Sequence, residues 1–442
     1  MKGNQELPFL LLITLISKIS GQRPPPIQPI VFSLPPPPSL TGELSSNNIL
    51  TNAERVHQNY IQGPASFVNH NGHLYSSTVD SKIYDLASCP PRLITNLAPP
   101  GCMDKYTCGQ ITSLRLEPAT GSLLALDTFR GLFSVNPETG SFKVLFHSNT
   151  FVNGRRPVHL NDMIVSSDGV IMMTDSSDTY SMEYDVYICM DGRPTGRILA
   201  LHPRNGFITE LVPGYFNFPN GLELTPDGDL LVTETCRAAV HRISLKRHSW
   251  LQVTPFSLNL PGLPDNIRSS GRGTYWVAMT YARHAGSSNP VDEYSGNPRY
   301  RSMGYRMMSL QTIRDMFTKW GIIVELDARG RVLTTLHDPT GSTLSTISEV
   351  NEYGGVLNIG SHLVNYMVRI IQPSITQSKS SVESLIQVKK SRCQLSDSQA
   401  DEIRRQLLPT TNGTTTARPT VTTSAVAATQ AVTATQGVTA AR

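Results

Sequence analysis

The chain has 442 residues, of which 39% are hydrophobic, and a formal net charge of +4. This length and composition indicate a globular protein with either one large all-β domain or two to three smaller domains. The basic clusters are short and lack interleaved aromatic residues, so they predict a solvated surface and exclude nucleic acid as an expected partner.

The first 21 residues have the pattern of a secretory signal. Lys2 is followed by a largely apolar run over 7–16 and then by the small residues Ser20 and Gly21. This pattern predicts a signal peptide over 1–21 that is cleaved after Gly21. The run is shorter than the about 20 apolar residues of a transmembrane helix, and a signal-anchor is the alternative. We therefore expect the secretory pathway, with the mature chain extracellular or at the cell surface.

Two segments near the ends of the chain have compositions that disfavour a packed core. Residues 22–56 are rich in proline and predict an extended linker that acts as a spacer. After a C-terminal extension over 373–408, residues 409–442 are rich in threonine and predict a disordered, mucin-like tail. Within it, Asn412 begins an Asn-Gly-Thr acceptor for N-glycosylation.

Six stretches between these ends share one pattern, a short strand, a turn that contains glycine, and a second apolar strand. They begin at Phe67, Leu114, Met163, Leu222, Asn266 and Glu349. The first five begin about 45–60 residues apart, close to the repeat length of four-stranded propeller blades. The pattern predicts an all-β fold, a six-bladed β-propeller over 57–372, and the alternative is two unrelated β-sandwiches.

The longer last interval contains the segment "YRMMSLQTIRDMFTKWG". Its apolar residues recur at helical spacing; they are Met308, Leu310, Ile313, Met316 and Phe317. An amphipathic insert on a propeller predicts a packed flank or lid, with a membrane anchor as the alternative.

Six cysteines fit an oxidising compartment and allow up to three disulfides. In "PPGCMDKYTCGQ", Cys102 and Cys108 stand at the ends of a short loop, which predicts a bridge between them. Metal-type CxxC spacing is absent from the sequence, so a zinc site is not expected.

Asn or Asp recurs at the point where three successive units begin. The motif "HLNDM" has Asn161 and Asp162, "FPNGL" has Asn220, and "LPDNI" has Asp265 and Asn266. The inner strands of a propeller line one channel, so these side chains are expected to meet there. Oxygen ligands of this kind suit Ca²⁺, and the alternative is that all are turn or strand-cap residues.

The same stretches, with "TISEVNEYGGVLNIGS", resemble the strictosidine synthase-like family, most nearly its animal members of the hemomucin type. The resemblance implies a six-bladed propeller. The related paraoxonases and gluconolactonases bind a Ca²⁺ ion in the channel. The resemblance therefore also implies a channel Ca²⁺ here, held by Asn161, Asn220, Asp265 and, as in the paraoxonases, Asn266. Relatives commonly have a ligand glutamate in the first blade, where this chain has Ala65.

The resemblance implies two chemistries. Paraoxonase-type members hydrolyse esters or lactones with Ca²⁺, whereas strictosidine synthases condense an amine with an aldehyde by means of a glutamate in the last blade. Glu349 is the nearest match to that glutamate, Glu352 is an alternative, and either would otherwise be a solvated acid at a strand end. Independently of the resemblance, His159 is a candidate general base, with a packed or exposed histidine as the alternative.

We therefore expect a secreted or cell-surface propeller with a Ca²⁺-dependent arylesterase or lactonase activity. Its channel would take an ester, a lactone or an amine or aldehyde ligand. The alternative is a surface glycoprotein of the hemomucin type, catalytically vestigial, that binds carbohydrate, lipid or protein partners.

Overall fold

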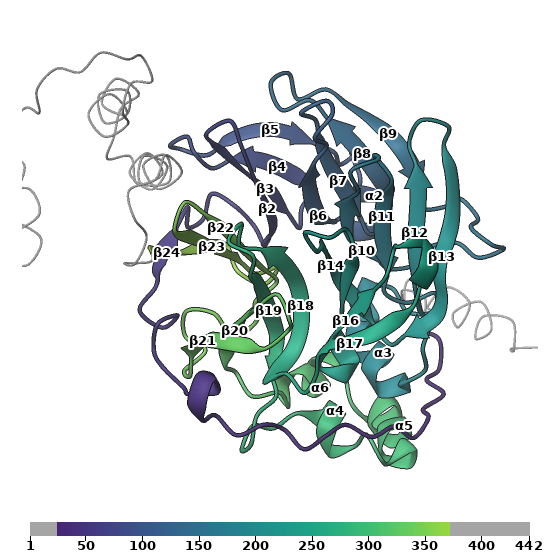
Figure 1. The fold of residues 1–442 in the computed structure, drawn as a ribbon, viewed down its shortest axis with the longest axis vertical. Helices are drawn as coiled ribbons and strands as arrows, with labels where there is room; N and C mark the ends of the chain where they lie inside the picture. The colour runs from purple at the N-terminus through teal and green to yellow at the C-terminus, as the bar shows by residue number, and fades with distance from the viewer. Residues whose placement is uncertain (1–23, 372–442) are drawn as a thin grey trace, which may run out of the picture.

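The computed structural model describes residues 24–371, which form six four-stranded antiparallel sheets arranged as a ring (Figure 1). Neighbouring inner strands contact one another all the way round, from β2 through β22 and back to β2. The predicted six-bladed β-propeller is therefore confirmed. The predicted signal peptide, C-terminal extension, mucin-like tail and Asn412 lie outside the described residues.

The first three blades run outward from the channel in chain order. Blade 1 contains β2 (Pro64–His70), β3 (His73–Thr78), β4 (Lys82–Asp85) and β5 (Arg92–Asn96). Blade 2 contains β6 (Ile111–Leu116), β7 (Leu123–Asp127), β8 (Gly131–Val135) and β9 (Phe142–His147). Blade 3 contains β10 (Leu160–Val165), β11 (Ile171–Asp175), β12 (Gly196–His202) and β13 (Phe207–Phe216).

The last three blades follow the same plan, except for the outermost strand of blade 6. Blade 4 contains β14 (Pro219–Leu224), β15 (Leu230–Glu234), β16 (Ala239–Ile243) and β17 (Val253–Ser257). Blade 5 contains β18 (Gly262–Ser269), β19 (Tyr275–Ala282), β20 (Gly321–Leu326) and β21 (Val332–Asp338). Blade 6 contains β22 (Glu349–Tyr353), β23 (Val356–Gly360), β24 (Met367–Ile371) and β1 (Glu54–Val56).

The strand β1 closes the ring, because it pairs antiparallel with β24, the last strand of the described residues. Closure by the first and last strands of the described residues satisfies an edge that would otherwise expose unpaired backbone groups. The propeller therefore begins before residue 57, inside the segment that the sequence predicted as a linker.

Local sequence explains the hairpins that join an inner strand to the second strand of its blade. The turns of "SSDG" and "TPDG" place Gly169 and Gly228 at φ +87° and +85°, a conformation that glycine adopts without strain. Between blades the packing is apolar; for example, Leu124 and Leu126 of β7 share one buried cluster with Met163 of β10. The glycine turns and the alternation of apolar and polar residues thus form each blade, and apolar packing between the sheets joins neighbouring blades.

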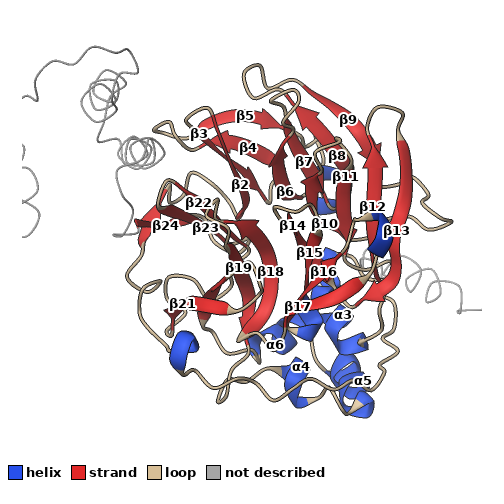
Figure 2. Cartoon of the chain, viewed as in Figure 1, coloured by secondary structure: helices blue, strands red, loops and turns tan. Residues whose placement is uncertain are grey.

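The helices are short. They are η1 (Gly42–Leu44), α2 (Lys105–Cys108), η2 (Met182–Tyr184), α3 (Asp185–Asp191), η3 (Thr235–Arg237), η4 (Arg247–Ser249), α4 (Pro290–Glu293), α5 (Pro298–Met307) and α6 (Leu310–Asp315). Helices α3 to α6 gather at one side of the propeller (Figure 2), and we call them the helical cap. Within 24–371, none of the helices is both long and apolar enough to cross a membrane.

The predicted amphipathic insert forms α5 and α6 of the helical cap. It is divided because Ser309 caps α6, its hydroxyl oxygen accepting the Thr312 N–H at 3.0 Å. Ile313 and Phe317 are buried in a cluster with residues of α3, whereas Met308 is exposed. The insert is thus a packed flank of the propeller, as predicted, but not one continuous amphipathic helix.

The prediction of a spacer is wrong for residues 24–50, which pack against the propeller. We call these residues the belt. In Figure 1 the belt runs as a purple trace along the helical cap. The Ile30 N–H donates to the Asp191 carbonyl at 3.0 Å. The buried Phe32 ring lies 4.1 Å from the Arg237 guanidinium and 4.8 Å from that of Arg301. Proline fixes an extended backbone, and here that backbone packs because buried apolar side chains stand between the prolines.

Phe32→Ala should lower the free energy of unfolding by about 3 kcal/mol, because it removes a buried ring and two cation–π contacts. Val31→Ala is the matched control, since Val31 is 67% exposed, and it should stay within about 0.5 kcal/mol of wild type. Urea unfolding of both variants measures the difference. Equal midpoints for the two would show that the belt is only a spacer.

A second stability prediction concerns His337, which is fully buried on β21. Burial, with a smaller contribution from the neighbouring His284, lowers the pKa of His337 to about 4. The neutral ring accepts a hydrogen bond from the Trp320 Nε1–H at 3.0 Å. Since the unfolded state binds the proton more tightly, stability should be complete above about pH 6.5 and decrease as the pH falls toward about 4. His337→Gln should flatten this slope in urea unfolding at several pH values, and an unchanged slope would contradict it.

Candidate functional site

Five of the six inner strands share an irregularity at the end where each begins. Register shifts interrupt the pairing of β2, β6, β10, β14 and β18 with their neighbours, each within the first residues of the strand. A bulge bends a strand and redirects its side chains. Six residues at these bulges line one cavity; they are Ala65, Thr112, Asn161, Asn220, Asp265 and Asn266.

Threonine hydroxyls on the second strands hold the bulges in place. Thr233 Oγ1 accepts the Gly221 N–H at 2.7 Å and donates to the Asp265 carbonyl of the next blade at 2.7 Å. Thr174 does the same one blade earlier, between the Asp162 N–H and the Asn220 carbonyl, at 2.9 and 2.8 Å. Backbone groups freed by each bulge are thus satisfied, and neighbouring blades are fixed to one another.

Asn220 lies in strand β14 and not in a turn, and its glycine neighbour has a packing role. A Cβ on Gly221 would lie 2.5 Å from the Ile267 nitrogen and 2.6 Å from Asn266 Cα. Only glycine lets β14 approach β18 this closely. The motif Pro-Asn-Gly therefore brings Asn220 next to Asp265 and Asn266.

The cavity has a volume of about 760 Å³ and is bounded by both the inner strands and the helical cap. This lies within the 300–1,000 Å³ that is typical of small-molecule sites. Its wall is partly aromatic and apolar, with Phe218, Tyr281 and Phe317 among the lining residues. Charged residues of the cap, including Asp185 and Arg314, line it as well.

Two amide oxygens at the bulges have no hydrogen-bond partner although they are buried. They are Asn220 Oδ1 and Asn266 Oδ1. Each amide is held through its nitrogen, since Asn220 Nδ2 donates to Thr235 Oγ1 at 3.2 Å and Asn266 Nδ2 donates to Glu349 Oε2 at 2.9 Å. An unpaired buried acceptor costs about 1–3 kcal/mol, so oxygens fixed in this way are arranged for a ligand.

Asp265 is the carboxylate of this group. Its Oδ2 accepts a hydrogen bond from Thr280 Oγ1 at 3.0 Å. Burial, together with the nearby Glu349 and Asp162 carboxylates, raises the pKa of Asp265 to about 7 against the hydrogen bonds from Thr280 and Asn220. Asp265 therefore stands where a cation would be stabilised.

His159 lines the same cavity and is almost fully buried. Burial lowers its pKa to about 4, so the ring is neutral near pH 7, and His159 Nδ1 has no hydrogen-bond partner. The ring packs against Phe218 with centroids 5.4 Å apart. Phe218 has φ +65°, a strained conformation of the kind that collects at functional sites.

Behind the bulges, five inner strands meet through buried ions that we call the channel ion network. Arg268 of β18 donates to Asp162 of β10 at 2.7 Å and to Glu349 of β22 at 2.6 Å. Arg115 of β6 contacts Asp162 and, on β14, Glu223, both at 3.4 Å. Burial would raise the pKa of Asp162, but Arg268 and Arg115 outweigh it and hold that pKa below its usual range.

The environment of Glu349 therefore differs from the solvent-exposed strand end that the sequence analysis considered. Glu349 is fully buried and not solvated, both its oxygens are hydrogen-bonded, and it is not among the residues that line the cavity. Burial raises its pKa to about 7 against the opposing charges of Arg268 and Arg115. Glu352 is also paired, with Arg272 and with the Trp276 Nε1–H at 2.6 Å. A catalytic role for either glutamate stays a prediction.

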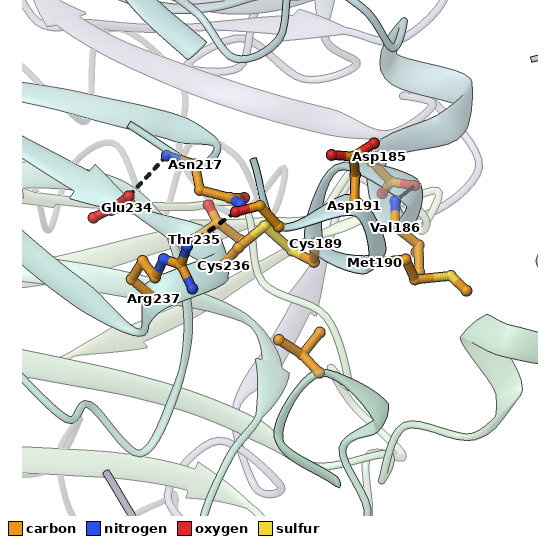
Figure 3. The surroundings of a disulfide bond; sticks show 12 residues. Asp185, Val186, Cys189, Met190, Asp191, Asn217, Glu234, Thr235, Cys236 and Arg237 are labelled. Atoms are coloured by element: carbon orange, nitrogen blue, oxygen red, sulfur yellow. Dashed lines mark hydrogen bonds between the residues drawn. A yellow bond between two sulfur atoms is a disulfide. The ribbon is translucent and has the colours of Figure 1, made fainter. Parts of the chain in front are cut away.

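Two disulfides join described residues. The predicted Cys102–Cys108 bridge is present. The second, Cys189–Cys236, links α3 of the helical cap to η3 of blade 4 (Figure 3). Figure 3 also shows Asn217, whose N–H donates to Glu234 at 2.7 Å. An even cysteine count permitted the second bridge, but the residues stand 47 positions apart and no local spacing indicates the pairing.

The sequence reasoning also missed Ser348 and His362 of blade 6, which line the cavity beside the bulges. They stand at the two ends of the hairpin in "SEVNEYGGVLNIGSH". Their positions at the two ends of one hairpin could have indicated the pair, because the ends of a hairpin lie side by side.

A family profile described as the SMP-30/gluconolactonase/LRE-like region matches residues 96–295. The adipocyte plasma membrane-associated protein of Gallus gallus is 35% identical over 350 residues, which cover 78% of this chain and 84% of that protein. The chain belongs to the family of adipocyte plasma membrane-associated proteins.

A more distant member of this adipocyte plasma membrane-associated protein family is the hemomucin of Drosophila melanogaster, 26% identical over 84% of this chain and 69% of that protein. Among solved structures, a gluconolactonase from Xanthomonas campestris has a TM-score of 0.49 and 14% identity, over 79% of this chain and 99% of that chain. The family name refers to the plasma membrane, and the two disulfides among described residues fit an extracellular location. The strictosidine synthase-like label is a finer assignment and stays a prediction.

Glu349→Gln should lower the free energy of unfolding by about 3 kcal/mol, because it leaves the buried Arg268 guanidinium with one carboxylate instead of two. Glu352→Gln is the matched control on the same strand, and it should cost less because its partner Arg272 is partly exposed. Urea unfolding of both variants measures this. If Glu349→Gln unfolds at the wild-type midpoint, Glu349 is not a structural ion and the catalytic prediction gains ground.

Proposed function

We propose that this chain is a Ca²⁺-dependent hydrolase of esters or lactones that acts outside the cell or at the cell surface. The observation that carries the proposal is the pair of unpartnered buried amide oxygens beside Asp265 in the wall of the cavity. Membership of a family whose profile includes gluconolactonases supports the hydrolase class.

The residues present fit a calcium ion. Asn161, Asn220, Asp265 and Asn266 would hold it, since all four line the cavity and offer the hard oxygen ligands that Ca²⁺ prefers. Among residues 24–371 there is no group of three or more His, Cys, Asp or Glu that could hold a metal, so the ligands would be mainly neutral. Because Ala65 adds no charge, we expect a dissociation constant of about 10⁻⁴–10⁻³ M.

A bound calcium ion would supply a positive charge that polarises a carbonyl group. Residues of the chain would bind the substrate and transfer the proton. Phe218, Tyr281 and Phe317 surround the apolar part of an ester or lactone and exclude water. His159, neutral and facing the cavity, accepts a proton from the attacking water.

Asn220→Ala should weaken calcium binding at least several-fold, and Ala65→Glu should tighten it by restoring an acidic ligand. Asn217→Ala is the matched control, because Asn217 is also a buried amide of the same region but is not a lining residue of the cavity. Calorimetric titration of the three variants with Ca²⁺ measures this. Identical binding by wild type and Asn220→Ala would refute the metal site.

Hydrolysis itself is tested with phenyl acetate and simple lactones in the presence of Ca²⁺ or of EDTA. Wild type should turn over at least one of these substrates with Ca²⁺, and EDTA should reduce the rate. No turnover under either condition would remove the hydrolase proposal.

The second candidate is a surface glycoprotein of the hemomucin type that binds carbohydrate, lipid or protein partners without catalysis. Ala65, which supplies no carboxylate to the cavity, supports it. Calcium binding without turnover would favour this function. Condensation of an amine with an aldehyde has less support, because both oxygens of Glu349 are held by Arg268 and Asn266.

A further inference from the structure

Blade 6 contributes a hydrogen-bonded serine and histidine to the cavity. Ser348 stands immediately before β22 and His362 two residues after the end of β23. Because Glu349 pairs with Gly360 across the hairpin, the two side chains meet. Ser348 Oγ lies 2.9 Å from His362 Nδ1, and both residues line the cavity.

The backbone fixes the serine on both sides. The Ser348 N–H donates to the Gly360 carbonyl at 2.9 Å, and the Ser348 carbonyl accepts the Asn266 N–H at 3.2 Å. The serine is therefore anchored to the strand that carries Asn266.

The hydroxyl is oriented as well. Ser348 Oγ accepts the His362 backbone N–H at 3.3 Å, which leaves its own proton for His362 Nδ1. Removal from water lowers the pKa of His362, so its ring is neutral near pH 7 and can accept that proton. One lone pair of Oγ stays available to a molecule in the cavity.

We propose that Ser348 is a nucleophile and His362 its general base in covalent acyl transfer, an inference that rests on the proposed ester or lactone hydrolysis. This arrangement meets the geometric requirement for an activated serine, a hydroxyl within hydrogen-bond reach of a base in a cavity. It assigns to blade 6 a part of the chemistry that the calcium ligands of blades 3 to 5 do not perform.

The reaction balances in two steps. Ser348 Oγ attacks the carbonyl carbon and its proton passes to His362 Nδ1. The bond to the leaving oxygen then breaks, and that oxygen takes the proton to leave as an alcohol. Water attacks the resulting acyl-serine and gives a proton to His362. The Oγ–acyl bond breaks, Oγ recovers the proton, and a carboxylic acid is released. With a lactone, the alcohol and the acid are the two ends of one product.

The test is labelling of the full-length chain with a fluorophosphonate, which reacts with activated serines, followed by peptide mapping. We expect the label on Ser348, none on that peptide in Ser348→Ala, and a rate at least about 100-fold lower in His362→Gln. Ser361→Ala is the matched control, a serine one residue before His362 that is not a lining residue of the cavity, and it should label like wild type. Thermal unfolding of all variants checks that they fold.

The outcomes separate this inference from the proposed function. Labelling of Ser348 that persists in EDTA or in Asn220→Ala supports the inference even if calcium-dependent turnover is lost. Wild-type turnover of phenyl acetate by folded Ser348→Ala overturns the inference and leaves the calcium-dependent hydrolase standing. Equal labelling rates in His362→Gln and wild type overturn the role of the histidine.

Discussion

The arrangement of the channel depends on one buried cation, the Arg268 guanidinium. It bridges two carboxylates, Asp162 and Glu349, that belong to inner strands on other blades. Removing one partner of such a group leaves a charge in the interior that nothing compensates, which costs several kcal/mol. The blades are therefore not free to shift against one another, and the channel ion network fixes the inner strands in register.

The side chains of the cavity take their positions from this network. Asn161 precedes Asp162, Asn266 lies two residues before Arg268, and Ser348 precedes Glu349. Bulges in β10 and β18 turn Asn161 and Asn266 toward the cavity, whereas the charged residues of the channel ion network are not lining residues. The cavity-lining groups thus stand on a rigid charged layer and need no ordering when a ligand binds, which lowers the free-energy cost of binding.

The blades could be predicted because their signals are local. Alternating apolar residues and turns such as "TPDG" define each hairpin, and six hairpins imply one ring. The convergence of Asn161, Asn220, Asp265 and Asn266 followed from that ring, and the structure brings all four to one cavity, although their role as ligands stays a prediction. The setting of Glu349 could not be predicted, because its partner Arg268 is 81 residues away and the pairing depends on bulges that no local pattern marks.

The packing of the belt could not be predicted from the sequence either, because its contacts come from residues far along the chain. Its prolines predict extended backbone, but packing is decided by Arg237 and Arg301, which come from blade 4 and the helical cap. Phe32 lies against both, and Cys236, next to Arg237, is bonded to Cys189 of α3. Belt, cap and blade 4 are thus joined by a covalent and an aromatic link on one side of the cavity. The disulfide therefore holds α3 of the helical cap against blade 4, and Phe32 holds the belt against both.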